Sequence, residues 1–198
     1  MKTNKKRGRP RTFEREGTVT LAMENYWREG PHALSVNEVC RRMGLSKPSL
    51  YREFGGEDGL LDAALEHYWK TVLAPLAAYF TPNHSFAETT EVLIAFATDP
   101  GERPKGCLLA KSRGVRERFG PVAGARVDTM SRTLKEAYLA MINRARDRGE
   151  VRGDITPELA ARYVDTQVTT ALHQVAAGQD PDEVRAQTEL AFAALLST

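Results

Sequence analysis

The stretch from residue 35 to residue 54 constrains the fold of this chain most, because it reads as two short helices joined by a tight turn. Ser35 is a good N-cap for the first helix, and Glu38 three residues later completes a capping-box pattern. Gly44 stands where a helix C-terminus favours a left-handed residue. Ser46 is then a second N-cap, so the pattern predicts a helix-turn-helix.

The second helix of this motif has an apolar face and several polar ones. Leu50 and Phe54 share the apolar face and are expected to pack inward. The second helix of a helix-turn-helix enters the major groove of DNA, where polar side chains bond to phosphates and base edges. The candidate DNA contacts are Ser35, Lys47, Pro48, Ser49, Tyr51 and Arg52. The plainer alternative is a helical hairpin inside an ordinary all-α domain.

Residues 1–12 are expected to form a flexible basic arm, because no apolar residue follows the initial methionine. Gly8 allows close backbone approach, and Pro10 holds the chain extended. This Arg-Gly-Arg-Pro segment resembles the core of an AT-hook, which would bind a narrow A·T-rich minor groove. The candidate minor-groove contacts are Arg7, Arg9 and Arg11. The alternative is a basic tail that binds phosphates without sequence preference.

Charge is divided unevenly along the chain. Residues 1–56 contain 12 Lys and Arg against 6 Asp and Glu, a net charge of +6, while the remaining 142 residues carry 16 against 20, a net of −4. The two values add up to the overall net charge of +2. The excess of positive charge therefore accompanies the helix-turn-helix, as expected of a segment that binds nucleic acid.

Residues 13–61 resemble the DNA-binding domain of TetR-family transcriptional regulators. The matching features are Phe13, Ala22, Gly30, the Gly44-Leu45-Ser46-Lys47 turn, the Leu50-Tyr51-x-x-Phe54 signature and Leu60-Leu61. A looser likeness runs through residues 144–198. One position departs from the family, which usually has a phosphate-binding lysine three residues after the signature phenylalanine. This chain has Glu57 there, so that contact is not expected.

The rest of the chain predicts an all-α fold of about nine helices, because apolar residues recur at helical spacing and never alternate as in strands. The expected parts are the arm at 1–12, a helix-turn-helix domain at 13–58, and a helical effector-binding and dimerisation domain at 59–198. Pro75 is expected to kink or interrupt a long helix. No apolar run is long enough to span a bilayer, so no membrane partner is expected.

The last two expected helices are rich in Ala, Val and Thr on one side, which allows close approach of another helix. In the TetR family, these helices form a four-helix bundle with a second subunit. A monomer could instead bury the same faces internally. Because one short recognition helix reads few bases, we expect a homodimer that binds palindromic double-stranded DNA, with half-sites roughly 34–36 Å apart or a multiple of that distance.

The resemblance also implies a pocket for a small organic effector within the C-terminal helices. Binding of the effector would shift the dimer geometry and lower the affinity for DNA. The candidate pocket residues are Trp69, Phe96, Cys107, Met130, Tyr138, Gln167 and Thr170. Core packing is the alternative for each of them. Gln167 and Thr170 are uncharged polar residues on an otherwise apolar helix and would need partners if buried.

Catalytic and metal-binding patterns are missing from the sequence. The four histidines are far apart, and no Ser or Cys lies in a nucleophile motif, so neither an enzyme nor a metal or other cofactor is expected. Cys40 is expected to be a buried structural thiol, with a redox switch as the alternative. Two cysteines without a signal peptide are typical of the cytoplasm.

The sequence therefore predicts a cytoplasmic, homodimeric, ligand-responsive transcriptional repressor. One alternative is an architectural DNA-binding protein that has no effector. Another is a small-molecule-binding or catalytic helical protein whose DNA module is vestigial, which only Glu57 favours.

Overall fold

A computed structural model describes residues 15–99 and 101–197, and within them the chain is helical, as predicted. Counting α4, a π-helical turn and α5 as one continuous helix gives nine α-helices in the described part, and the only strand-like pairing there is an isolated bridge between Val151 and Leu196. The helices are α1 (Arg15–Glu29), α2 (Val36–Met43), α3 (Lys47–Phe54), α4 (Glu57–Tyr68), α5 (Ala74–Ala78), α6 (Phe86–Thr98), α7 (Leu108–Arg113), α8 (Pro121–Asp147), α9 (Pro157–Ala176) and α10 (Pro181–Ala193).

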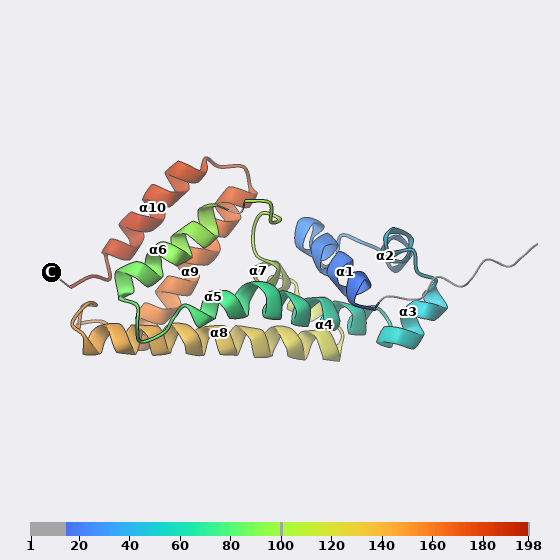
Figure 1. Cartoon of the computed structure of the whole chain (residues 1–198), viewed down its shortest axis with the longest axis horizontal. Helices are drawn as coiled ribbons and strands as arrows, with labels where there is room; N and C mark the ends of the chain where they lie inside the picture. Colours follow the sequence, from blue (N-terminus) through green and yellow to red (C-terminus); the bar gives the residue numbers. More distant parts are fainter. Residues whose placement is uncertain (1–14, 100, 198) are drawn as a thin grey trace, which may run out of the picture.

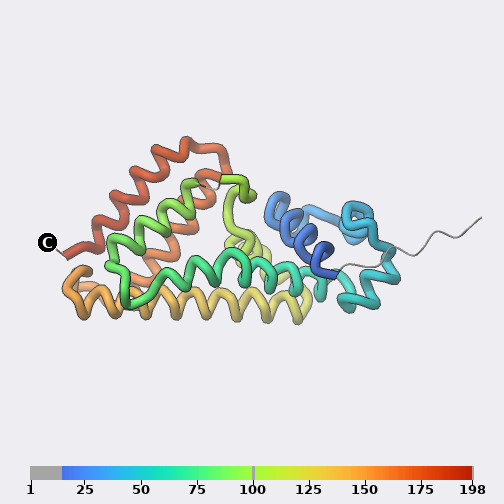
Figure 2. The backbone as a smooth tube through the Cα atoms, viewed as in Figure 1, coloured from blue at the N-terminus to red at the C-terminus, as the bar shows by residue number. Residues whose placement is uncertain are grey.

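The molecule is elongated, with α1, α2 and α3 gathered at one end (Figures 1 and 2). The side chains of Ala22, Tyr26, Val39 and Leu50 are fully buried between these helices and α4. Apolar burial of this kind is what holds short helices such as α2 and α3 in place, because eight-residue helices are not stable alone. Helix α3, the second helix of the helix-turn-helix, thus has a fixed position at the tip of the molecule.

Helix α4 leads from this end into the rest of the chain and runs beside α8, the longest helix with 27 residues (Figure 1). The predicted interruption at Pro75 is confirmed. A π-helical turn at Trp69–Leu73 lies directly before it, and α5 continues the same helix. Because proline has no N–H to donate to the preceding turn, the wider π-turn there is physically reasonable.

The other end of the molecule consists of α6, α9 and α10 packed on one another, and of these α9 and α6 also contact α8. Their shared core contains Leu93, Val164, Leu172 and Phe192, all nearly or fully buried. None of the helices in the described part of the chain is both long and apolar enough to cross a membrane.

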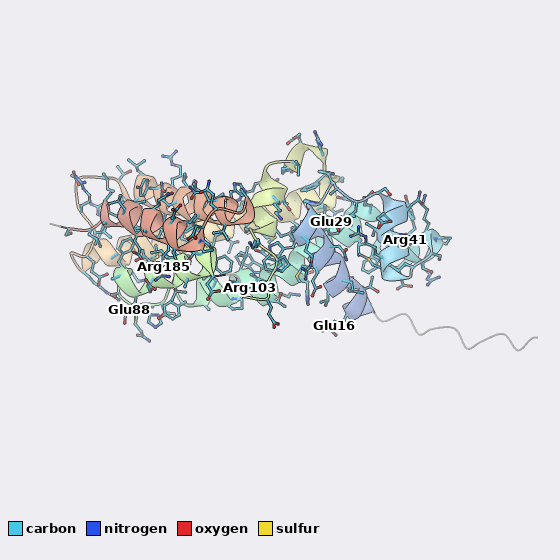
Figure 3. All side chains as sticks on the ribbon, turned by 90° about the horizontal axis from the view of Figure 1, so that it is seen from above. Glu16, Glu29, Arg41, Glu88, Arg103 and Arg185 are labelled. Atoms are coloured by element: carbon cyan, nitrogen blue, oxygen red, sulfur yellow. The ribbon has the colours of Figure 1, made fainter. Side chains whose placement is uncertain are left out.

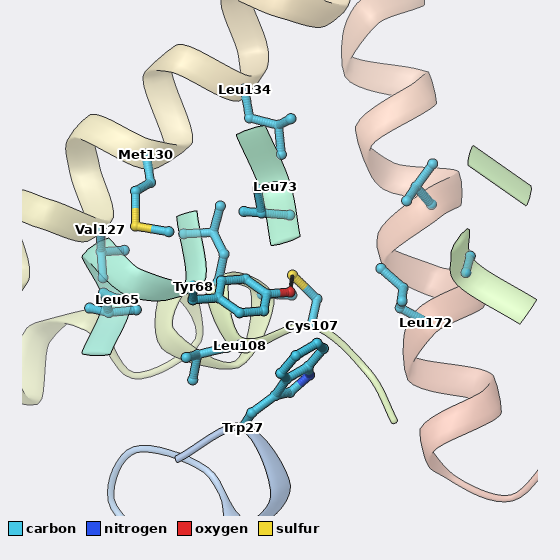
Figure 4. Close-up of a cluster of buried hydrophobic side chains, with 14 of the residues drawn as sticks. Trp27, Leu65, Tyr68, Leu73, Cys107, Leu108, Val127, Met130, Leu134 and Leu172 are labelled. Carbon is cyan, nitrogen blue, oxygen red and sulfur yellow. Dashed lines mark hydrogen bonds between the residues drawn. The ribbon is translucent and has the colours of Figure 1, made fainter. Parts of the chain in front are cut away.

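A cluster of aromatic and sulfur-containing side chains joins the two ends (Figure 4). The rings of Trp27 and Tyr68 meet edge-on with centroids 4.7 Å apart, and the Tyr68 hydroxyl lies 3.3 Å from the sulfur of Cys107. The indole N–H of Trp27 donates to the carbonyl of Gly106 at 2.9 Å. Trp27 belongs to α1 and Tyr68 to α4, and Cys107 is the residue directly before α7. These contacts therefore attach the N-terminal helices to the body of the protein.

Candidate nucleic-acid interface and interior cavity

The caps of α2 follow the sequence prediction with one exception. Ser35 accepts a hydrogen bond from the backbone N–H of Glu38 at 3.3 Å, and Gly44 ends the helix in the left-handed conformation with φ of 63°. The side chain of Glu38 does not return to the backbone of Ser35, so the predicted capping box is only half formed. Its carboxylate instead binds Arg41 and Arg42, which lie one turn further along α2.

Arg42 fixes α2 against α1. Its guanidinium group donates to Glu38 on its own helix and to Glu29 and Asn25 on α1. Hydrogen bonds from Arg41 and Arg42 lower the pKa of Glu38 to about 2, and the two carboxylates raise the pKa of Arg42. Figure 3 shows Glu29 and Arg41 at this end of the molecule. These arginines are therefore used within the protein and carry charge that is already balanced.

The recognition helix α3 has the predicted caps and faces. Ser46 accepts from the N–H of Ser49 at 3.2 Å, and the Ser46 hydroxyl also donates to that of Ser49 at 2.9 Å. Leu50 and Phe54 are buried, as predicted. The exposed residues of α3 are Lys47, Pro48, Tyr51 and Arg52, whereas Ser49 is half-buried. Four of the five predicted DNA contacts on α3 are therefore exposed to solvent.

Two of the exposed residues have local contacts. Tyr51 is 58% exposed, and a Cβ at Gly56 would lie 3.3 Å from its ring, so the ring covers the turn before α4. The guanidinium of Arg52 lies 2.8 Å from the carboxylate of Glu53. An exposed pair of this kind is weak and exchanges readily for a phosphate.

Most of the net positive charge of residues 1–56 lies outside the described residues. Residues 15–56 contain 6 Lys and Arg against 5 Asp and Glu, a net of +1, whereas residues 1–14 contain 6 against 1, a net of +5. The two values reproduce the +6 counted for residues 1–56. The predicted minor-groove contacts Arg7, Arg9 and Arg11 belong to this undescribed segment, so the AT-hook prediction stays a prediction.

Glu57 lies in the first turn of α4 and is half-buried. Burial raises the pKa of its carboxyl group, and nearby His32 opposes that shift. The hydroxyl of Tyr26 is buried and has no hydrogen-bond partner among residues 15–99 and 101–197, and burial together with Glu57 raises its pKa. A carboxylate is not a phosphate-binding group, so the absence of a phosphate contact at Glu57 stays a prediction.

The C-terminal helices enclose a narrow cavity of about 20 Å³, the space of roughly one water molecule. Three of the predicted pocket residues line it, namely Phe96, Cys107 and Tyr138. Trp69, Met130, Gln167 and Thr170 lie outside its lining, and Met130 is packed in the hydrophobic core. On α9 the cavity is lined by Asp165, Val168, Thr169 and Leu172, so the polar candidates Gln167 and Thr170 lie beside the stretch of α9 that faces the cavity and not in it.

The cavity wall contains an ion pair that the sequence did not predict. The guanidinium of Arg113 on α7 donates to the carboxylate of Asp165 on α9 at 3.1 and 3.2 Å, and its Nε donates to the hydroxyl of Ser131 on α8 at 2.9 Å. Both charged side chains are about one-third exposed or less. The only available sequence signal was a lone acidic residue, Asp165, within the apolar stretch of an expected helix.

Both cysteines are free and buried, which confirms the burial predicted for Cys40. Burial is the main cause that raises the pKa of the Cys40 thiol, while Lys47 acts in the opposite direction. A thiol in that state is a poor nucleophile at neutral pH. Across residues 15–99 and 101–197, no three His, Cys, Asp or Glu side chains are grouped as a metal site would require.

The family model described as "Bacterial regulatory proteins, tetR family" matches residues 19–64, which include the helix-turn-helix. The HTH-type transcriptional repressor ComR of Escherichia coli (strain K12) is 38% identical over 64 residues, covering 32% of this chain and 30% of that protein. The repressor BdcR of the same organism is 32% identical over 100 residues, covering 50% of this chain and 51% of that protein. The chain thus spans about half or less of the length of these two relatives in the matched regions.

Solved structures match over nearly the whole chain. A cysteine mutant of the TetR family transcriptional regulator CifR, complexed with 26-bp double-strand operator DNA, has a TM-score of 0.77 at 24% identity and covers 95% of this chain and 100% of that one. A TetR-family regulator from Agrobacterium tumefaciens has a TM-score of 0.80 at 17% identity, with 92% and 97% covered. At such identities the likeness establishes a common fold.

Proposed function

Because the chain belongs to the TetR family of transcriptional regulators, we propose that it is a sequence-specific DNA-binding repressor controlled by a small molecule. One observation carries the DNA-binding part. Lys47, Pro48, Tyr51 and Arg52 are exposed together on a well-capped helix at the tip of the molecule, away from the bulk of the protein. This is the geometry that a recognition helix needs to enter a major groove.

We further propose that the protein acts as a homodimer through α9 and α10. The outer surface of these helices exposes Leu190 on α10 to 76% and Leu159 on α9 to 50%. The exposed residues of the two helices also include Thr166, Thr170 and Ala186, which are small and uncharged. A twofold dimer would bury these apolar side chains and place two copies of α3 on one face of the DNA.

The relatives ComR and BdcR are described as transcriptional repressors, and the proposal accordingly assigns the chain no catalytic activity. The proposal includes a cytoplasmic location, where a bacterial regulator would meet its operator. The competing proposal is an architectural DNA-binding protein, which would use the basic arm and α3 without a strict sequence preference or an effector.

Selection from random DNA duplexes tests the proposal directly. The full-length protein should enrich one palindromic motif whose half-sites are spaced by about one helical turn, or a multiple of it. Arg52→Ala should relax the preference at one base position if Arg52 reads a base, or weaken all sequences alike if it binds phosphate. Enrichment of A·T content without a palindrome would favour the architectural protein instead.

A further inference from the structure

The narrow cavity of the C-terminal helices is separated from a surface groove by two side chains. The groove has a volume of about 420 Å³ and is lined by residues of the π-turn, α5 and α6, with Asp99 and Arg103 at its edge. Leu76 and Phe96 line both the groove and the cavity. Sites for small organic ligands usually measure about 300–1,000 Å³, so the cavity is too small alone and the groove is large enough.

Phe96 is the movable part of this wall. It is half-buried, and the guanidinium of Arg103 lies over its ring at 4.6 Å from the centroid. Arg103 also donates to the backbone carbonyl of Asp99 at 3.1 Å. A change of side-chain rotamer at Phe96 would join groove and cavity without a shift of the backbone.

We propose that this joined space binds a neutral, mainly apolar small molecule, whose body replaces the ring of Phe96 and whose polar group reaches Arg113 and Asp165. The binding of this ligand does not depend on the proposed function. Only a role for the ligand in controlling DNA binding rests on it. The apolar walls come from four elements and consist of Leu73, Leu76, Leu109, Leu134, Val168 and Leu172. They supply the burial that an apolar body needs.

The charges of the site select a neutral ligand. Arg113 is paired with Asp165 and bonded to Ser131, so the interior has no net charge to offer. At the mouth, Asp99 and Arg103 also carry opposite charges. A charged ligand would bring an uncompensated charge into a largely apolar space, which is unfavourable, whereas a neutral hydroxyl or amide can donate to Asp165 or accept from Arg113, and a carbonyl can accept from Arg113.

Two fluorescent probes that differ in one charged group test this selection. N-phenyl-1-naphthylamine is neutral, and 8-anilino-1-naphthalenesulfonate has the same aromatic rings with a sulfonate added. In titrations of the full-length protein, the neutral probe should bind about tenfold more tightly than the sulfonate. Phe96→Ala should tighten binding of the neutral probe several-fold, because it removes the side chain that the ligand must displace.

Asp165→Asn provides the sharper variant. It leaves Arg113 without its balancing charge, so the preference for the neutral probe should fall by about tenfold or reverse. Asp147→Asn makes the same charge change at the exposed end of α8 and should leave both affinities unchanged. If Asp165→Asn does not fold, as judged by circular dichroism, the affinity of Phe96→Ala for the neutral probe still tests whether the ligand displaces the Phe96 ring.

The proposal is overturned if both probes bind equally well, or if neither variant alters their binding. A selected DNA palindrome together with no probe binding would remove this inference and leave the proposed DNA-binding function intact. If the probes bind as expected but the selection yields no DNA motif, the ligand site is supported and the proposed DNA-binding function is not.

Discussion

The carboxylate of Asp58 caps α8 from a different helix, accepting hydrogen bonds from the backbone N–H of Val122 at 2.9 Å and from that of Ala123 at 3.2 Å. Asp58 itself lies in the first turn of α4. Gly120, the residue before α8, makes room for this contact, since a Cβ there would lie 2.5 Å from the carboxylate. The helix that follows the recognition helix is thereby attached to the longest helix of the body.

Asp58→Ala should lower the free energy of unfolding by about 1 kcal/mol, the usual effect of losing an N-cap side chain. The reason is that two N–H groups of α8 lose their acceptor, and Gly120 has no side chain to replace it. Urea denaturation followed by circular dichroism measures the change. Asp147→Ala, at the exposed end of the same helix, is the matched control and should stay within about 0.5 kcal/mol of the parent protein. Equal effects of the two substitutions would contradict the cross-helix cap.

The Glu38 network should make stability depend on pH in acid. The pKa of Glu38 in the folded protein is about 2, lowered from an ordinary value of 4.5 by hydrogen bonds from Arg41 and Arg42. The folded state therefore holds this proton less tightly than the unfolded chain. The stabilisation is fully present above pH 4.5 and is lost as the pH falls from 4.5 to 2.

Glu38→Gln should remove that part of the pH dependence. The variant should be less stable than the parent protein above pH 5, and the difference between them should shrink toward zero by pH 2. Because the group is at the surface, added salt should reduce the difference as well. Denaturation midpoints measured from pH 2 to pH 7 provide the comparison. Glu136→Gln, exposed on α8, serves as the control and should keep the parent's pH profile.

The helix-turn-helix was predictable because its signals are local. Ser46, Gly44 and Leu50 act through neighbours within one helical turn, and each has the predicted role. Glu38 shows where local reasoning fails. Its carboxylate could bond either to the backbone of Ser35 or to arginines three and four residues on, and the structure has the second arrangement. Both possible partners can be read from the sequence, but which of them Glu38 bonds to cannot.

The cavity was less predictable because its residues come from helices far apart in the sequence. Arg113 and Asp165 are 52 residues apart, and nothing near either one signals the other. The predicted residues Gln167 and Thr170 lie close to the inward stripe of α9, but the packing of α9 against its neighbours sets which residues turn inward. That rotation is a property of the tertiary fold.

The basic arm, more than α3, should provide the electrostatic attraction to DNA. Deleting residues 2–14 removes 6 Lys and Arg and 1 Glu per chain. Each lost phosphate contact should reduce the slope of log K against log salt concentration by about 0.9. The slope should therefore fall more for this deletion than for the double variant Lys47→Ala and Arg52→Ala, which removes two charges. Fluorescence anisotropy with the selected duplex at several salt concentrations measures both slopes.

The same deletion separates the two interpretations of the arm. Binding in a narrow minor groove by Arg7, Arg9 and Arg11 requires the loss of affinity to be larger for operators with A·T flanks than for those with G·C flanks. An equal loss for both flanks is the result expected of a tail that binds phosphates alone, and it would remove the AT-hook interpretation.

Gly59 is required by the close approach of α3 to α4. A Cβ on Gly59 would lie 1.7 Å from the carbonyl oxygen of Phe54, a backbone atom that cannot move without shifting the end of the recognition helix. Gly59→Ala should therefore cost about 3 kcal/mol or prevent folding, at the upper end of overpacking substitutions. Gly153→Ala is the control, because a Cβ there meets nothing within 4 Å. Denaturation of the two variants side by side measures the difference, and a Gly59→Ala protein as stable as the Gly153→Ala one would show that the turn between α3 and α4 is looser than the structure has it.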